Sequence, residues 1–443
     1  MKVALDHINF KRGWPTPRII PAQALNAAAA KVFGQEGIEN DLEYGPGHGI
    51  QPLRENIANW LSQAYIPAAG KINEDRILVT NGASNGLAML LQKIADPVFT
   101  RAVWLIEPTY FLACPIFRDA GMGGRIRGVP ETEDGVDLEF LAKALSEVDR
   151  DGHFETPAPK KTPELNYPKI YRHIIYLIPT FSNPSGKTME LRSREALVRL
   201  ARKHDALVIS DDVYDFLKWP ALERDRNKDV GACPPRLVDV DHNLDGCLPY
   251  GNCVSNGSFS KIVAPGVRVG WLEGSTKLMS VMGTVGATAS GGCQSHMASL
   301  LINELLANGT IQDHIEKVLI PTYKARYYSL MGAIEKYLVP LGVTVGSGTD
   351  YDSRGMAGGF FTYISFEKCG INTDIIAPIA LHAYNLQIAP GHIFAVPDDP
   401  SSKERTIKSY GKGARLCWAW HEEEKLVEGI LRLATVIKSL KTI

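Results

Sequence analysis

The sequence has few cysteines, no long apolar run and no excess of charge of either sign. Its seven cysteines are widely spread and include no C-x-x-C pair, so neither a disulfide framework nor a zinc site is indicated. No run of about eighteen apolar residues is present, and the start of the chain lacks the apolar core of a secretory leader. The formal net charge is -1, and no basic stretch suggests nucleic-acid binding. These absences predict a cytoplasmic protein that contacts neither membrane nor nucleic acid.

The sequence is long enough to form more than one hydrophobic core. The sequence has 443 residues, of which 45% are hydrophobic. Single cores seldom grow beyond ~250–300 residues, so two packed lobes are expected.

One stretch organises the rest of the chain: residues 256–261, Asn-Gly-Ser-Phe-Ser-Lys, followed closely by Arg268. A lysine has an unperturbed pKa of ~10.4, so a lysine that attacks an aldehyde must be desolvated or lie beside other cations. Apolar residues surround Lys261 in the sequence, and Ser258, Ser260 and Arg268 could hold a dianionic phosphate. The alternative interpretation is a surface lysine after a Ser/Gly turn.

A glycine turn between a strand and a helix suggests a second phosphate contact. The β-rich residues 76–80 lead through Gly82, Ala83 and Ser84 into a stretch with apolar residues at helical spacing. A helix start presents free N–H groups and the positive end of the helix dipole to an anion. An ordinary N-cap by Ser84 is equally compatible with this pattern.

Two further strand-like segments end in polar residues. Residues 174–179 lead into the turn Asn183-Pro-Ser-Gly186, and residues 206–210 lead into Asp211. A carboxylate buried at a strand end costs several kcal/mol unless it is paired, and a protonated ring nitrogen would be a suitable partner. A plain turn and a surface Asp pair are the alternatives.

In their order and spacing, these motifs resemble those of the class I/II aminotransferases of fold type I, which bind pyridoxal 5′-phosphate (PLP). The resemblance runs from about Gly13 to Trp418. It implies an α/β three-layer sandwich with a mainly parallel central sheet, plus a smaller α+β domain. The implied division is an N-terminal arm over 1–45, a large PLP-binding domain over 46–295 and a small domain over 296–443, against which the arm could pack.

The resemblance also implies roles for matching residues. Lys261 would form a Schiff base with the cofactor, Asp211 would keep its ring nitrogen protonated, and Tyr214 would hydrogen-bond to its phenolate oxygen; these three are the expected catalytic residues. The expected cofactor site is Tyr44, Gly82, Ala83, Ser84, Tyr110, Asn183, Asp211, Tyr214, Ser258, Ser260, Lys261 and Arg268. The expected substrate site is Gly13, Trp14, Asn183 and Arg415. Arg415 would grip the substrate α-carboxylate with its planar guanidinium. Asp212 departs mildly from the family, which often has glutamate there.

Residues 44–54 match the family motif Tyr-x-x-x-x-Gly-x-x-x-Leu-Arg. In the family this tyrosine reaches the phosphate in the other subunit, so the match implies a homodimer in which Tyr44 crosses the interface. A loop tyrosine that packs locally is the alternative.

The implied reaction is transamination between an L-amino acid and a 2-oxo acid. Because a fold does not fix the fate of the carbanion, a PLP-dependent lyase or synthase remains an alternative. Related domains are also fused to DNA-binding modules, although this chain begins directly at the arm. The pattern lies nearest the enzymes for 2-aminoadipate, kynurenine or aromatic amino acids, and Arg12, Trp14 and Arg18 could meet an acidic or aromatic side chain.

Two polar stretches, 149–169 and 220–252, are interpreted as surface insertions. The second contains or adjoins Cys233, Cys247 and Cys253, but their spacing is not that of metal ligands.

Overall fold

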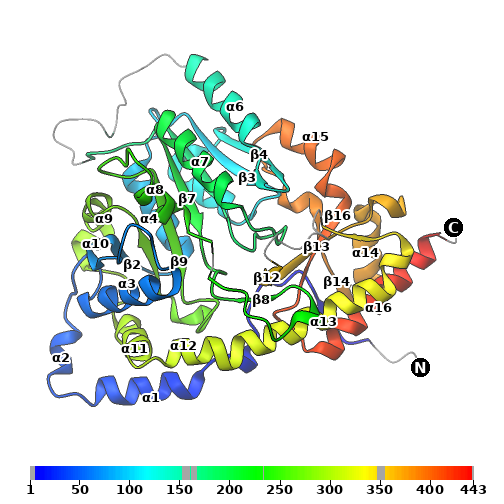
Figure 1. The fold of residues 1–443 in the computed structure, drawn as a ribbon, viewed down its shortest axis with the longest axis horizontal. Coiled ribbons are helices and arrows are strands. Elements are labelled where there is room, and N and C mark those ends of the chain that lie inside the picture. The colour runs from blue at the N-terminus through cyan, green and yellow to red at the C-terminus, as the bar shows by residue number, and fades with distance from the viewer. Residues whose placement is uncertain (1–4, 152–159, 161–166, 233, 347–354, 442–443) are drawn as a thin grey trace.

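An eight-stranded sheet forms the centre of the larger lobe (Figure 1). The computed structural model describes residues 5–151, 160, 167–232, 234–346 and 355–441. The strand order is β2-β10-β9-β7-β6-β3-β4-β5, and the neighbouring pairs from β9 to β4 are parallel, whereas β10 is antiparallel to β2 and β9. The bounds are β2 Ile77–Thr80, β3 Ala102–Glu107, β4 Ile126–Thr132, β5 Gly135–Val136, β6 His173–Leu177, β7 Ala206–Asp211, β9 Cys253–Ser258 and β10 Gly270–Glu273.

Helices cover both faces of this sheet, because successive strand residues point to opposite sides. In β3, Val103 and Leu105 belong to one apolar core, whereas Ala102 and Trp104 belong to the other. The first core is completed by α4 (Ala83–Ile94), α5 (Ala113–Phe117) and α9 (Thr276–Met282). The second is completed by α6 (Leu138–Asp151), α7 (Leu191–Lys203) and α8 (Leu237–Asn243). The predicted three-layer α/β architecture is confirmed.

The smaller sheet is antiparallel throughout, in the order β11-β13-β16-β15. Its strands are β11 (Thr344–Val345), β13 (Phe361–Ser365), β15 (Ala389–Pro390) and β16 (Gly413–Cys417). Helices α13 (Ile320–Tyr337), α14 (Thr373–Tyr384) and α16 (Glu423–Lys441) pack beside it, and α15 is Pro400–Lys408. A smaller α+β part is therefore present, while the domain limits at 45/46 and 295/296 remain a proposal.

The N-terminal arm joins the smaller lobe through a short strand. Residues Ile8–Asn9 form β1, which pairs in parallel with β14 (Leu386–Gln387), so the arm contains regular structure. The chain continues through α1 (Ala22–Phe33), α2 (Ile38–Asp41) and α3 (Gln51–Tyr65), and α11 (His296–Ala307) packs against α1 and α3. A second link is β8 (Lys218–Pro220) paired with β12 (Met356–Gly358), and the short helices α10 (Gly286–Gly291) and α12 (Thr310–His314) flank α11 in sequence.

The interpretation of 220–252 as a polar insertion is wrong in part. This stretch contains α8, whose Leu237, Val238 and Val240 are buried against the central sheet. The helix was missed because it is only seven residues long and its residues 238–241 alternate apolar and acidic side chains. Most of 149–169 lies outside the described residues. Among the helices that the structure describes, none is both long enough and apolar enough to cross a membrane.

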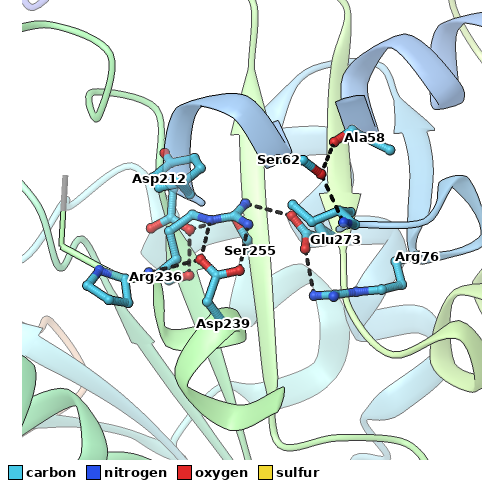
Figure 2. A network of polar contacts seen from close by, with 12 residues as sticks. Ala58, Ser62, Arg76, Asp212, Arg236, Asp239, Ser255 and Glu273 are labelled. Atoms are coloured by element: carbon cyan, nitrogen blue, oxygen red, sulfur yellow. Dashed lines mark hydrogen bonds and ion pairs between the residues drawn. The ribbon is translucent and has the colours of Figure 1, made fainter. Parts of the chain in front are cut away.

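A buried ionic network ties α8 to the edge of the central sheet (Figure 2). Arg236, only 1% exposed, donates from Nε and Nη2 to the two carboxylate oxygens of Asp239, at 2.9 Å each. Its Nη1 donates to Glu273 of β10 at 2.6 Å, and Arg76 donates to the other oxygen of Glu273 at 2.7 Å. The network thus holds together segments far apart in the sequence.

Replacing Arg236 by methionine is expected to lower the free energy of unfolding by about 3–5 kcal/mol, because Asp239 loses its buried cation and Glu273 loses one of two. Arg199→Met is the control. It breaks an exposed ion pair with Glu195 on α7, worth at most about 1 kcal/mol. Urea unfolding followed by circular dichroism measures both values. Losses of equal size in the two variants would contradict the prediction.

Candidate active site

The carboxyl ends of the parallel strands open into a cleft of about 560 Å³, where ligands of open α/β sheets usually bind. Thirteen of the residues expected from the sequence line this cleft: Gly13, Trp14, Ala83, Ser84, Tyr110, Asn183, Asp211, Tyr214, Ser258, Ser260, Lys261, Arg268 and Arg415. Tyr44 and Gly82 are not among the lining residues. The structure therefore gathers into one cavity side chains that lie up to four hundred positions apart.

Lys261 lies in the turn that follows β9, not in the strand itself. Its ammonium group is held away from bulk water, with Nζ donating to the carbonyl oxygen of Gly13 at 3.0 Å and lying 5.3 Å from the ring centroid of Phe360. Desolvation lowers the pKa of Lys261 to about 8. An appreciable fraction of this amine is neutral near neutral pH, as a nucleophile or base requires.

Asp211 ends β7 and is 8% exposed. Tyr176 of β6 donates its hydroxyl to Oδ2 at 2.7 Å, whereas Oδ1 is buried and has no hydrogen-bond partner within the described part of the chain. Burial raises the pKa of Asp211 to about 6, and the hydrogen bond from Tyr176 acts in the opposite direction. Such a carboxylate is suited to a cationic N–H donor supplied by a ligand.

A second carboxyl group stands directly after Asp211. Asp212 is 4% exposed and accepts hydrogen bonds from the hydroxyls of Ser210 and Ser255 (Figure 2). Both hydrogen bonds reach Oδ2, one from Ser210 of β7 and one from Ser255 of β9, whereas Oδ1 is buried and has no hydrogen-bond partner within the described residues.

Arg268 and two serines form a small polar cup. Ser258 donates its hydroxyl to Ser260 at 2.9 Å, and Nη1 of Arg268 donates to Ser260 at 3.4 Å. Position 82 requires glycine because an added Cβ would lie 2.4 Å from Nη2 of Arg268. Its φ of +80° also favours glycine. The α4 helix begins at the next residue, so unpaired backbone N–H groups of its first turn face the same region. The cup is suited to a phosphate dianion.

Arg415 lies in β16 and is 4% exposed. Its Nη1 donates to Oδ1 of Asn183 at 2.6 Å, its Nη2 donates to the carbonyl of Lys11, and its Cζ lies 4.1 Å from the ring centroid of Phe361. Burial lowers the pKa of Arg415. Because Asn183 accepts through its carbonyl oxygen, its NH₂ group remains available as a donor.

Two tyrosines complete the cleft. Burial raises the pKa of Tyr214 well above its usual value and that of Tyr110 to about 12. Both therefore keep their hydroxyl protons near neutral pH and can act as donors.

Two expected residues lie elsewhere. The Tyr44 side chain is 86% exposed and does not line the cleft of its own chain. Arg18 is also outside the cleft, with its side chain 77% exposed and 3.4 Å from Glu422.

Three residues that support the site were missed from the sequence. Tyr176 donates to Asp211, Phe361 lines the cleft, and Trp420 lies outside the lining but beside Arg12 and Trp14. Tyr176 pairs with Ile209, so it lies on the same face as Asp211. This relation appears only once β6 and β7 are placed in register. Phe361 and Trp420 reach the site through tertiary packing and carry no sequence signal of their own.

Comparison with known proteins identifies the family. The family model for aminotransferases of class I and II matches residues 13–336. The uncharacterized protein YER152C of Saccharomyces cerevisiae is 33% identical, over 98% of this chain and 97% of the yeast protein. Aromatic-amino-acid aminotransferase 1 of Thermococcus litoralis is 25% identical, over 98% of this chain and 88% of that protein. The crystal structure of the multiple substrate aminotransferase of Thermococcus profundus matches with a TM-score of 0.76 and 25% identity, over 100% of this chain and 94% of that one.

The chain belongs to the class I and II aminotransferase family. It is an enzyme that carries out transamination, and its cofactor is PLP. The residues of the cleft fit this group. The buried Oδ1 of Asp211 suits a protonated ring nitrogen, the cup around Arg268 suits the phosphate, and the partly desolvated amine of Lys261 suits the aldehyde. No finding favours the lyase or synthase alternative.

Proposed function

We propose that Lys261, Asp211 and Tyr214 are the catalytic residues of transamination between an L-amino acid and a 2-oxo acid. PLP supplies the electron sink for negative charge that forms at the substrate α-carbon. The assignment rests on one observation: Lys261, whose pKa is lowered, lines the same cleft as the buried carboxylate of Asp211 and the buried guanidinium of Arg415.

Lys261 moves the proton in this proposal. Its neutral amine would act as the base that takes the α-proton of the bound amino acid, and the ammonium so formed would act as the acid that gives the proton back. A pKa of about 8 suits both halves of this transfer, since neither protonation state is strongly disfavoured near neutral pH.

Asp211 and Tyr214 would stabilise the charges of the cofactor ring. The Asp211 carboxylate would keep the ring nitrogen protonated, and the Tyr214 hydroxyl, which stays protonated because of burial, would donate to the phenolate oxygen. Tyr110 would contact the ring. The cup of Ser258, Ser260 and Arg268 would hold the phosphate together with the N–H groups of Ala83 and Ser84.

In this proposal Arg415 binds the substrate α-carboxylate, and Asn183 orients the guanidinium of Arg415. The 2.6 Å hydrogen bond from Nη1 to Asn183 fixes the guanidinium, and the ring of Phe361 packs on its face. The free NH₂ of Asn183 donates to the cofactor's phenolate oxygen in this assignment. Gly13 and Trp14 line the substrate side of the cleft.

A panel of L-amino acids tests the function. Each donor is incubated with stoichiometric holoenzyme, and the appearance of pyridoxamine phosphate and of the matching 2-oxo acid is measured by chromatography. Transamination predicts both products in equal amounts for at least one donor. Ammonia release without pyridoxamine phosphate from every reactive donor would instead support the lyase alternative. The names of the relatives point to aromatic amino acids and to multiple substrates, so they do not select one side chain.

We also infer a homodimer in which Tyr44 enters the partner's site. The support is its position on an exposed loop, with the side chain 86% exposed and outside the cleft of its own chain. Sedimentation is expected to give twice the mass of the 48.6 kDa chain, and Tyr44→Phe is expected to weaken PLP retention without changing that mass. A fully active monomer would contradict this inference.

A cytoplasmic location is part of the same proposal and rests on the composition of the sequence. Cell fractionation with an antibody to the chain tests it, and recovery in a membrane or organelle fraction would contradict it.

A further inference from the structure

Arg12 lies in the arm at the mouth of the cleft, beside two tryptophans. Its Cζ atom is 4.9 Å from the ring centroid of Trp14 and 4.5 Å from that of Trp420. The two indole rings are 6.3 Å apart and nearly perpendicular, so they form a corner that holds the guanidinium. Such cation–π contacts fix an arginine without using its N–H donors. Arg12 lines the cleft, so these donors can reach a ligand.

The backbone on either side of Arg12 is anchored to the reactive groups. The carbonyl of Lys11 accepts from Arg415, and that of Gly13 accepts from Lys261. Asn9 accepts from the backbone N–H of Lys11 and of Arg12, at 3.0 Å each. Arg12 is therefore held at a fixed place relative to the residues that bind the α-carboxylate and move the proton.

The charges of the cleft leave Arg12 without an anion. Its lining residues include the cations Lys11, Arg12, Lys261, Arg268 and Arg415, and the carboxylate of Asp211 is the one acidic side chain among them. Within the described ranges, no ion pair includes Arg12. With the cofactor phosphate at Arg268 and the substrate α-carboxylate at Arg415, as proposed above, Lys11 and Arg12 would still lack an anion. Of these two, Arg12 is the one held between the indole rings.

We propose that Arg12 binds a second carboxylate at the far end of the substrate side chain, so that the enzyme prefers dicarboxylic amino acids and 2-oxo acids. This inference rests on the proposed function. The planar guanidinium, held in the corner between the two indole rings, keeps its N–H donors for a bidentate pair with a carboxylate. A substrate without that group leaves Arg12 unpaired and loses this interaction.

Two pairs of donors of equal chain length test the proposal: glutamate with norvaline, and 2-aminoadipate with norleucine. For Arg12→Gln, kcat/KM with the dicarboxylic donors is expected to fall on the order of 10- to 100-fold, mainly through a higher KM. The values for norvaline and norleucine are expected to stay within about threefold, since they make no charged contact there. Arg18→Gln, which changes an exposed arginine outside the cleft, is the matched control and is expected to resemble the wild type for all four donors.

Binding of glutarate, a dicarboxylate that cannot react, gives a readout that needs no turnover. Because Trp14 and Trp420 flank Arg12, glutarate is expected to change the tryptophan fluorescence of the wild type and of Arg18→Gln, but not of Arg12→Gln. Butyrate, which has a single carboxylate, is expected to displace glutarate poorly.

Equal losses for dicarboxylic and neutral donors in Arg12→Gln would overturn the proposal, because they would show that Arg12 only supports the arm. A wild type that does not favour the dicarboxylic donors would also overturn it. Failure of every donor to yield pyridoxamine phosphate would defeat the proposed function instead, and the glutarate titration would still report on Arg12.

Discussion

Lys261→Ala is expected to lose turnover by at least about 10⁴-fold, because the change removes the amine that we propose as both nucleophile and base. No other lysine side chain takes its place at the end of β9 beside the carbonyl of Gly13 in the described residues. Steady-state rates with the best donor of the panel measure the loss. Borohydride reduction followed by peptide mapping is expected to place the cofactor on Lys261 in the wild type and to leave it unattached in the variant.

Lys277→Ala serves as the control for Lys261→Ala. Lys277 is exposed on α9, in the same lobe, and its ammonium lies 4.8 Å from the ring centroid of Tyr250. This variant should keep wild-type turnover and the same covalent attachment. A folded Lys261→Ala protein with turnover within tenfold of the wild type would show that another group performs the proton transfer.

Asp211→Asn is expected to lower kcat by about 10²–10³-fold and to weaken PLP binding, because it removes a negative charge while nearly preserving shape. The amide oxygen can still accept the hydrogen bond from Tyr176, so the change isolates the charge at the buried Oδ1 position. The neutral amide of the Asp211→Asn variant would no longer favour protonation of the ring nitrogen of PLP. Turnover and equilibrium dialysis of PLP against the cofactor-free variant measure the two effects.

Tyr176→Phe separates charge from hydrogen bonding at the same place. It leaves the Asp211 carboxylate but removes the 2.7 Å hydrogen bond to Oδ2, so a loss of about tenfold or less is expected. If Tyr176→Phe cost more than Asp211→Asn, the hydrogen bond and not the charge would be the main contribution of this pair.

Much of the site could be predicted because its residues belong to short motifs at the ends of buried strands. Asp211 ends β7, Lys261 follows β9 and Asn183 follows β6, and parallel strands bring their carboxyl ends to one edge of a sheet. The position of Gly82 was also visible, although its reason, the close approach of Arg268, required the folded chain.

The remaining contacts depend on pairings that no local pattern encodes. Tyr176 meets Asp211 through the register of β6 and β7, and Trp420 meets Arg12 across almost the whole chain. The strand in the arm could not be predicted, because two residues are too few to give a periodic signal. Strands β13 and β16 of the smaller sheet are each five residues long and give a longer pattern.

The pairing of β1 with β14 also has a consequence for how the chain matures. Ile8 and Asn9 emerge from the ribosome long before Leu386 and Gln387, which lie 378 positions later. Until those residues are made, the arm has no strand to dock on, and Gly13 cannot be held against Lys261. The contact between Gly13 and the Lys261 amine is therefore expected to form only after Leu386 and Gln387 have been made.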